Sequence, residues 1–156
     1  MASQRNKQNE LKIKFLDFGI TRIEFQLNEA FIAKKRKAVK FGTLIDGEAI
    51  FDKKNLNLTI KLEVRVPETE AMPFRIEVQG KGVFKLSKEP ENFEKVAWIN
   101  CAAIIFPFIR ETVADVTRRS GLAPLFIPPI NFVRLYEARK KDFKKHKVPK
   151  KIVINT

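Results

Sequence analysis

The chain has 156 residues, of which 44% are hydrophobic and 31% charged, a balance that excludes a largely disordered chain and favours one domain with a hydrophobic core. Its single cysteine excludes an intramolecular disulfide, and its polar N-terminus and the lack of a run of ~18 apolar residues predict neither a signal peptide nor a membrane span. We therefore expect a cytoplasmic protein, and the net charge of +13 favours contact with nucleic acid, anionic membrane surfaces or acidic proteins.

The positive charge is concentrated in two segments of the chain. The first is a cluster within residues 34–40, and the second runs from Arg134 to the C-terminus with nine Lys and Arg residues against two acidic ones. The basic positions that we single out are Lys34, Lys35, Arg36, Lys37, Lys144 and Lys145. Such clusters either bind an acidic partner or only keep the surface solvated, and composition leaves both interpretations open.

Alternating apolar residues predict one long, bent strand over residues 11–27, after a disordered N-terminus of residues 1–10. The alternation changes phase twice, and a change of phase turns every later side chain to the other face of a sheet. Bulges near Phe15–Leu16 and Thr21–Arg22 would restore the facing, so we expect the strand to bend at these two points. Residues 28–37 then form a crossover loop that carries the first basic cluster.

Three further strands are predicted. The second covers residues 38–45 and ends at the turn signal Asp46-Gly47. Strict alternation over residues 56–66 and 72–86 predicts two strands with one covered face and one wet face, as in an antiparallel sheet. The glycines at positions 80 and 82 indicate a bulge in the last strand or a close approach of another backbone.

Helical spacing follows the strands. The main helix is expected to start at about Phe106–Pro107, because proline suits the first turn of a helix, and to stop at Gly121. An apolar, Pro-stiffened loop covers residues 122–130. Asn131 is the expected N-cap of a second helix, which ends at Pro149 at the latest.

Four strands followed by two helices are typical of the α+β class. We predict a four-stranded antiparallel, Greek-key-like sheet with the two helices packed on one face. A single domain should cover residues 11–146, followed by a basic tail over residues 147–156. No repeat or linker divides the sequence further.

The residue types that carry catalysis are scarce and scattered. His146, the single histidine, sits in a Lys-rich segment, and Cys101 precedes an apolar run, where a small buried hydrophobe is the better interpretation. The sequence has no metal-ligand cluster and no phosphate-binding Gly loop. We therefore predict a protein that is not an enzyme and uses neither a metal nor a cofactor.

The basic charge motivates two alternatives, a nucleic-acid-binding module and a membrane-surface protein. The basic segments lack interleaved aromatic residues apart from Phe31 and Phe143, so the sequence indicates no stacking platform for bases. The polar face of the predicted sheet alternates in sign through Lys61, Glu63 and Arg65. This pattern suits a partner of mixed charge better than a phosphate backbone.

Three motifs resemble the SecB family of ATP-independent export chaperones. Residues 101–111 read Cys-Ala-Ala-Ile-Ile-Phe-Pro-Phe-Ile-Arg-Glu and are similar to the family's Cys-Pro-x-Ile-Leu-Phe-Pro-Tyr-Ala-Arg-Glu. Residues 74–84, Phe-Arg-Ile-Glu-Val-Gln-Gly-Lys-Gly-Val-Phe, resemble Phe-x-x-Glu-Val-Gln-Gln-x-Gly-Ile-Phe. Residues 128–136, Pro-Pro-Ile-Asn-Phe-Val-Arg-Leu-Tyr, resemble Ala-Pro-Val-Asn-Phe-Asp-Ala-Leu-Phe, and the likeness extends weakly to the first strand.

The resemblance implies a tetramer, built as a dimer of dimers through the first strands and the long helices. It also implies a groove that holds unfolded polypeptide. The groove candidates are Phe31, Phe41, Leu44, Leu122, Leu125, Phe126, Ile127, Phe132 and Tyr136. Any one of these can instead simply cover the sheet, but the loop of residues 122–130 fits a groove wall as a unit, because its prolines hold apolar side chains apart.

The resemblance also implies a docking surface for the motor protein SecA, with Arg22, Gln26, Arg75 and Glu77 as the contact positions. The family has acidic first-strand positions and an acidic C-terminus, whereas here Glu77 alone keeps its character and the chain ends in a basic segment. Some family members serve toxin–antitoxin systems, where the client is an antitoxin and no SecA surface is needed. We therefore expect a homo-oligomeric holdase for unfolded clients, in export or for a dedicated antitoxin, with a nucleic-acid-binding module as the alternative of another class.

Overall fold

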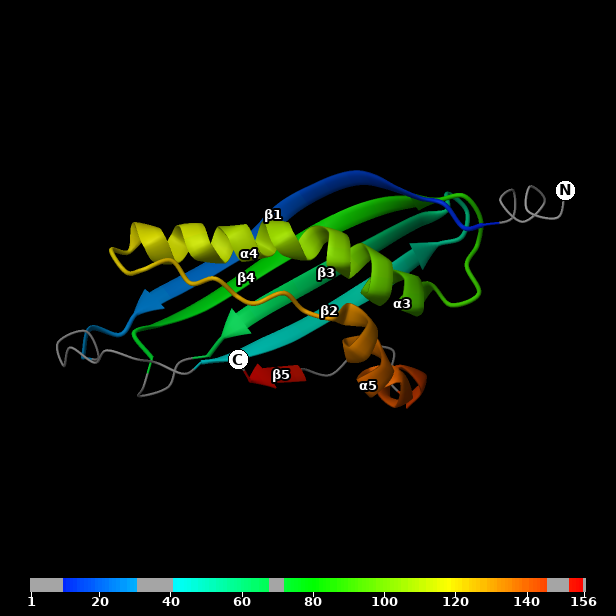
Figure 1. Ribbon diagram of the computed structural model, residues 1–156. Coiled ribbons are helices and arrows are strands. Elements are labelled where there is room, and N and C mark those ends of the chain that lie inside the picture. The colour runs from blue at the N-terminus through cyan, green and yellow to red at the C-terminus, as the bar shows by residue number, and fades with distance from the viewer. Residues whose placement is uncertain (1–9, 31–40, 68–71, 146–151, 156) are drawn as a thin grey trace, which may run out of the picture.

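The computed structural model describes residues 10–30, 41–67, 72–145 and 152–155, and it contains one antiparallel sheet with helices on one face (Figure 1). The strands are β1 (Ile13–Leu27), β2 (Gly42–Asp52), β3 (Asn57–Val66), β4 (Phe74–Leu86) and β5 (Ile152–Asn155). Their order across the sheet is β1-β4-β3-β2-β5, so the first and fourth strands are neighbours, as in a Greek key. The predicted α+β class and the one-sided arrangement of the helices are confirmed.

A fifth strand extends the predicted four-stranded sheet. Residues 152–155 pair with the outer edge of β2, although the sequence pattern predicted a tail over residues 147–156. The run Ile-Val-Ile in this segment is rich in β-branched residues, which favour an extended backbone, and an existing edge strand offers it a partner. Residues 146–151 lie outside the described part of the chain.

β1 bends at two bulges, as predicted. Its register with β4 shifts at Leu16 and again at Thr21, and neither residue has a partner across the ladder. Each bulge turns the following apolar side chains back toward the covered face. The predicted disorder of residues 1–10 stays a prediction, because residues 1–9 lie outside the described part of the chain.

The predicted turn at Asp46-Gly47 is wrong, because β2 passes straight through these two residues. Gly47 is needed for packing: a Cβ atom there would lie 2.6 Å from the carbonyl oxygen of Lys61 and 3.1 Å from the indole ring of Trp98. The chain reverses instead in the turn formed by residues 53–56. The glycine thus allows a helix to approach the sheet closely.

One continuous helix of 27 residues, Phe93–Arg119, lies across the covered face (Figure 1). It consists of α3 (Phe93–Val96), the π-helical segment η1 (Ala97–Cys101) and α4 (Ala102–Arg119). The predicted start at Phe106–Pro107 is wrong, because Pro107 lies inside α4. Pro107 has no N–H to donate, so the carbonyl group of Ala103, four positions earlier, loses its partner within the helix. Both residues are exposed, so water can replace the missing hydrogen bond.

By length and composition alone, this helix also qualifies as a candidate membrane span, although no span was predicted from the sequence. Its buried stripe packs on the sheet through residues that include Ile105, Ile109 and Val113. The core helix of a globular domain meets the same criterion, so the match is weak evidence for a span.

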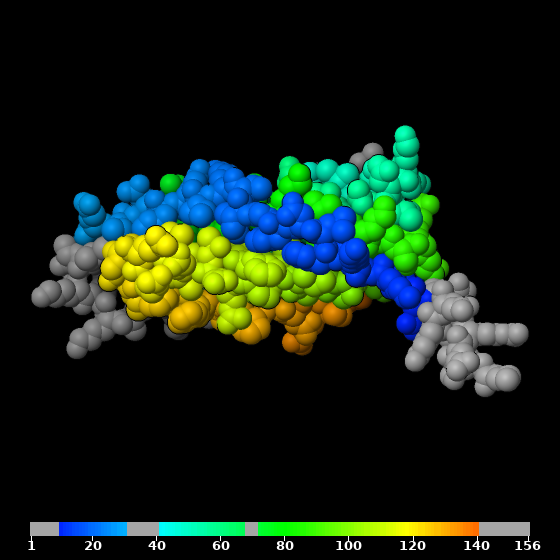
Figure 2. Space-filling model, turned by 90° about the horizontal axis from the view of Figure 1, so that it is seen from above, coloured from blue at the N-terminus to red at the C-terminus, as the bar shows by residue number. Residues whose placement is uncertain are grey.

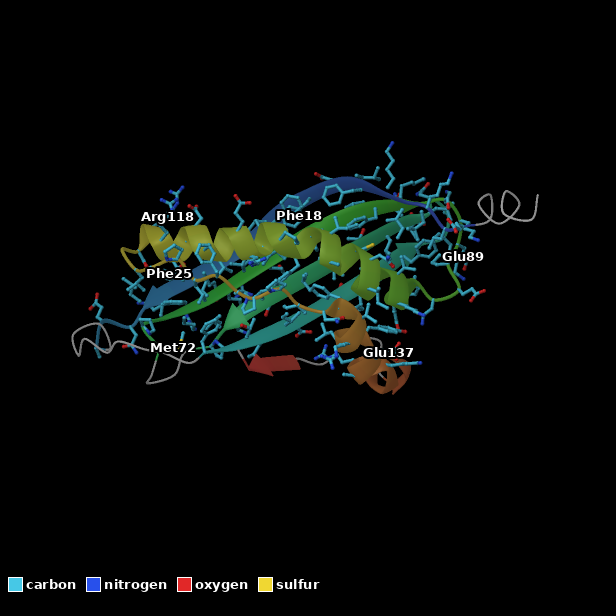
Figure 3. All side chains as sticks on the ribbon, viewed as in Figure 1. Phe18, Phe25, Met72, Glu89, Arg118 and Glu137 are labelled. Atoms are coloured by element: carbon cyan, nitrogen blue, oxygen red, sulfur yellow. The ribbon has the colours of Figure 1, made fainter. Side chains whose placement is uncertain are left out.

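Close packing between α4 and the sheet depends on two glycines of β4. A Cβ atom at Gly80 would lie 3.0 Å from the side chain of Ile109, and one at Gly82 would lie 2.8 Å from that of Ile105. The pairing of β4 with β3 runs through both positions without a shift. The predicted bulge in β4 is therefore wrong, and the close approach is made by side chains rather than by another backbone. Figure 3 shows the side chains that fill the space between helix and sheet.

α5 (Phe132–Lys145) begins where the sequence predicted. The side chain of Asn131 accepts a hydrogen bond from the backbone N–H of Arg134 at 3.1 Å, which is the geometry of an N-cap. α5 packs against η1, so the loop between α4 and α5 must cross back over the covered face to reach it.

Candidate functional site

The apolar loop between α4 and α5 is fixed in place at its middle. The backbone N–H of Leu125 donates to Oγ1 of Thr117 at 2.8 Å, and this buried hydroxyl donates to a carbonyl oxygen one helical turn earlier at 2.9 Å. Ile127 is 1% exposed and belongs to the core, whereas its neighbour Phe126 is 66% exposed. The loop therefore buries Ile127 and holds the Phe126 ring outward.

Three of the predicted groove residues are part of the core. Ile127, Phe132 and Tyr136 are all buried. The ring of Phe132 packs edge-on against Phe106 at a centroid distance of 5.6 Å, and the Tyr136 hydroxyl accepts a hydrogen bond from the Asn92 side chain at 2.9 Å. These side chains attach the loop and α5 to the body of the protein, so their assignment to an accessible groove is corrected.

The predicted groove residues near the start of β2 do not share a face. Phe41 packs against the core, whereas Leu44 lies opposite Arg65 in the row of side chains on the open face. Residues three positions apart in an extended chain point to opposite faces, so these two cannot line one groove. Phe31 lies outside the described residues.

The accessible apolar residues of the loop and of the first turn of α5 form what we call the loop surface. Its members are Leu122, Leu125, Phe126 and Val133. Leu122 and Leu125 are half-buried, and Val133 is exposed. Val133 was missed because it falls off the apolar stripe of α5, and an apolar residue off the stripe was the signal that could have found it.

A second apolar area, which we call the edge surface, lies along β1 and α4. Figure 2 shows these two elements side by side on one flank of the molecule. Its exposed members are Phe15, Leu16, Ile23, Ile104 and Phe108. Phe108 stacks on Phe18 of β1 at 5.1 Å between ring centroids and lies 6.2 Å from Phe15, so helix and strand present one joined aromatic cluster.

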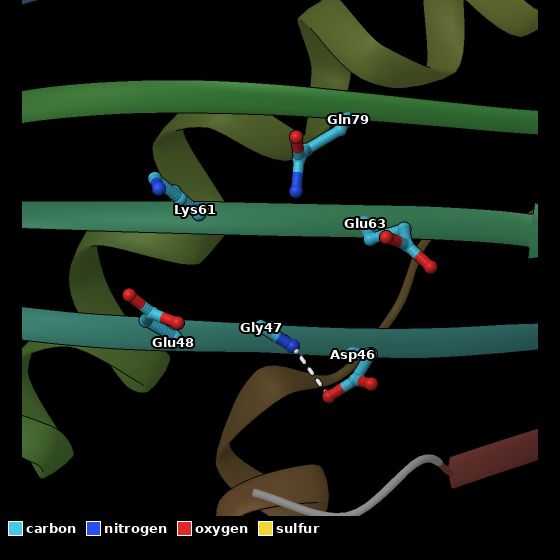
Figure 4. A pocket seen from close by; sticks show the side chains of 6 residues that line it. All are labelled: Asp46, Gly47, Glu48, Lys61, Glu63 and Gln79. Atoms are coloured by element: carbon cyan, nitrogen blue, oxygen red, sulfur yellow. Dashed lines mark hydrogen bonds between the residues drawn. The ribbon is translucent and has the colours of Figure 1, made fainter. Parts of the chain in front are cut away.

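The open face of the sheet is polar and carries a hollow of about 160 Å³ (Figure 4). Its lining residues are Asp46, Gly47, Glu48, Lys61, Glu63 and Gln79. The pKa of Glu63 is raised above its ordinary value because the carboxyl group is partly buried and faces the carboxyl group of Glu77, although Arg65 partly offsets this.

The four predicted partner-contact residues lie together on the open face, on the adjacent strands β1 and β4. Gln26 is opposite Arg75 in the register, and the guanidinium group of Arg22 contacts Glu77 at 3.1 Å. Arg22 also forms an ion pair with Glu24, and this contact lowers the pKa of the Glu24 carboxyl group. Arg75 also acts on Glu24, so two arginines balance the charges of Glu24 and Glu77 on this part of the surface.

The described residues include no arrangement of three His, Cys, Asp or Glu side chains that would hold a metal ion. Burial raises the pKa of the Cys101 thiol to about 12, so the thiol stays protonated at neutral pH and is a poor nucleophile. His146 lies outside the described residues, as do Lys34–Lys37 of the first basic cluster. Lys144 and Lys145 of the second cluster end α5.

A family model described as "Preprotein translocase subunit SecB" matches residues 22–142 of the chain. Curated relatives named "Protein-export protein SecB" include one from Aromatoleum aromaticum, 35% identical over 94 residues, and one from Paramagnetospirillum magneticum, 46% identical over 69 residues. These alignments cover 60% and 44% of this chain, and 57% and 44% of the relatives. The chain thus spans about half the length of the curated relatives that it matches.

The fold is also similar to that of a solved structure, a SecB-like chaperone from Mycobacterium tuberculosis in complex with a ChAD peptide from an antitoxin. The TM-score is 0.57 at 15% sequence identity, and the match covers 76% of this chain and 91% of that one. At this level of identity the likeness supports the fold.

Proposed function

Because the chain belongs to the SecB family, whose model matches residues 22–142, we propose that it is an ATP-independent chaperone of the cytoplasm. In this role it binds unfolded or non-native polypeptide and keeps it from aggregating before export. The names of its curated relatives support the link to export. We assign client contact to the loop surface.

The observation that carries this proposal is the fixed, outward position of Phe126. Its neighbour Leu125 is hydrogen-bonded to Thr117, and Ile127 is buried, so the ring is presented without any segment having to become ordered on binding. Burying each side chain of this size gains roughly 1.5–3 kcal/mol. A few such anchors, less the ordering cost of the client, correspond to about micromolar affinity.

We assign contact between copies of the chain to the edge surface. Its aromatic and aliphatic side chains are exposed on a strand and a helix that lie side by side, and a second copy would cover them. A dimer of such dimers would carry several loop surfaces and would bind a long unfolded chain with avidity. The expected native mass is four times the 18.1 kDa of one chain, which light scattering measures directly.

An antitoxin client is the second candidate function. One observation favours it: Arg22 pairs with Glu24 and Glu77 on the open face, and Arg75 acts on Glu24 as a second positive charge, so these four residues offer no net negative charge to a SecA-like motor. The M. tuberculosis relative was solved with an antitoxin peptide. Tight binding of one dedicated client, with weak binding of unrelated unfolded proteins, would favour this role over general export.

An aggregation assay tests the loop surface. An unfolded protein is diluted into buffer without ATP, with or without the native chain, and light scattering is followed. Phe126→Ser, alone and combined with Val133→Ser, should raise the concentration needed for suppression by about tenfold or more, since the lost burial is worth roughly 1.5–3 kcal/mol. Ile50→Ser is the matched control, because Ile50 of β2 is an apolar residue of similar exposure that lies outside the loop surface.

Full suppression by both loop variants would overturn the assignment of client contact to the loop surface. No suppression by the unaltered protein, together with tight binding to RNA that weakens steeply with salt, would favour the nucleic-acid-binding alternative.

A further inference from the structure

The two edges of the sheet are finished in different ways. One edge is β1, whose two bulges interrupt its ladder, and the other edge of the body is β2, onto which β5 is added. The paired residues are Gly42 with Asn155, Thr43 with Ile154, Leu44 with Val153 and Ile45 with Ile152. Within the described part of the chain, β5 thus covers four of the 11 residues of β2.

The outer edge of β2 is a regular template for strand pairing. Its inner side pairs with β3 from Leu44 to Asp52 without a shift, and Thr43 and Ile45 are fully buried, so the strand is held firmly. A regular edge strand offers a row of backbone N–H and C=O groups to any extended chain. At the opposite edge, two bulges interrupt the pairing of β1 with β4, so the outer row of backbone groups of β1 is less regular.

The segment that occupies this edge indicates which kind of chain fits it. β5 reads Ile-Val-Ile-Asn, an apolar, β-branched sequence that favours an extended backbone. Main-chain pairing accepts many sequences, because it uses groups that every residue carries. A longer extended segment could continue along β2 beyond Ile45, through backbone groups alone, and form more ladder hydrogen bonds than the four-residue β5.

We propose that the outer edge of β2, at Gly42–Ile45, is a strand-addition site for an extended segment of an unfolded client, and that β5 occupies this site when no client is bound. The proposal rests on the chaperone function proposed above. Because β5 is tethered to the same chain, its effective concentration at the edge is on the order of millimolar. A client must displace β5 to bind, so a client segment with a weak preference for an extended backbone does not bind at this edge.

Shortening the chain tests this competition. A variant that ends at Lys151 lacks β5, and the probe is fluorescently labelled lysozyme kept unfolded by reduction and alkylation. If β5 covers the edge about nine-tenths of the time, its removal should tighten the apparent Kd about tenfold. The peptide Lys-Ile-Val-Ile-Asn-Thr, which is the sequence of residues 151–156, should bind the shortened chain and compete with the probe.

Two proline variants provide a matched comparison within the full-length chain. Neighbouring strand residues direct their N–H groups alternately toward and away from the partner strand. Of Val153→Pro and Ile154→Pro, therefore, only one removes a ladder hydrogen bond to β2. That variant should behave like the shortened chain, and the other like the unaltered protein.

Amide hydrogen exchange at Gly42–Ile45 separates the possible outcomes. Exchange should be faster in the shortened chain and slow again when the unfolded lysozyme is added. Equal exchange and equal client affinity in both chains would overturn this inference and leave the chaperone proposal intact. Loss of client binding by every form of the protein would overturn the chaperone proposal itself. A fall in oligomer mass on shortening would show that β5 pairs with a second copy, which contradicts occupancy within one chain.

Discussion

The two faces of the sheet are built from the same strands, yet they differ in what they tolerate. On the covered face, Leu62 and Val78 are fully buried, and glycines stand where the long helix comes closest. On the open face, Lys61 and Glu63, which flank Leu62 in the chain, remain in contact with water. Shape therefore constrains the first face, because every added or removed methyl group changes the packing, whereas charge balance constrains the second.

This difference predicts how much stability a substitution on each face should cost. Changes of volume on the covered face should cost several times more stability than changes of charge on the open face. The following three experiments test that ranking in order of expected effect.

The largest effect should come from emptying the covered face. Ile109→Ala removes a fully buried side chain of α4 that lies against Gly80, and it should lower the free energy of unfolding by about 2–5 kcal/mol in urea denaturation. Glu111→Ala, on the exposed side of the same helix, should change it by less than about 0.5 kcal/mol. Equal small losses in both variants would mean that α4 does not close this face.

An intermediate effect should come from overfilling the same face. Gly82→Ala places a Cβ atom 2.8 Å from Ile105 and 2.9 Å from Phe84, so the helix or the ring must shift. The expected loss is about 1–3 kcal/mol, measured by urea denaturation. Gly19→Ala is the control, because a Cβ atom there meets nothing within 4 Å, and it should be neutral or slightly stabilising. A loss at Gly19 as large as that at Gly82 would contradict the packing argument.

The smallest effect should come from the open face and should depend on pH. The pKa of Glu63 is raised in the folded protein, so the ionised carboxylate destabilises folding once the pH exceeds this raised pKa. The penalty is absent below the unfolded value of 4.5 and appears as the pH rises through the folded pKa. Glu63→Gln should therefore be more stable than the unaltered protein at pH 7, by about 0.5 kcal/mol because water screens this partly exposed group.

The stability advantage of Glu63→Gln should disappear below about pH 4, where the carboxyl group is protonated in both states. Urea denaturation at the two pH values measures it. Glu48→Gln serves as the control, because Glu48 lies opposite Lys61 rather than opposite another acid. A loss of stability at pH 7 for Glu63→Gln would mean that its attraction to Arg65 outweighs burial and the repulsion by Glu77.

The covered face could be predicted from the sequence because burial repeats every second residue along a strand. Even the bulges at Leu16 and Thr21 follow from changes in that repeat. The turn predicted at Gly47 and the helix start predicted at Pro107 are wrong because both depend on contacts that are not local in the sequence. Gly47 leaves room for the ring of Trp98, which lies some fifty positions away in the chain. Pro107 is tolerated because its side of the helix faces water.

The candidate site was predictable as a segment but not residue by residue. Phe126 and Ile127 are adjacent, large and apolar, so the sequence gives no reason to bury one and expose the other. The hydrogen bond from Leu125 to Thr117 sets this phase, and it joins residues eight positions apart across the end of a helix. Phe41 and Leu44 were grouped because both are apolar, although the strand period separates their faces.

Thr117 belongs to the buried stripe of α4, and its hydroxyl also accepts the hydrogen bond that positions the loop. The geometry of the loop surface is therefore set by the same packing that closes the core. Such a site should have no melting transition of its own, because it is lost only when the whole domain unfolds. Heating should thus leave client capture intact up to the unfolding temperature of the domain and then remove it in a single step.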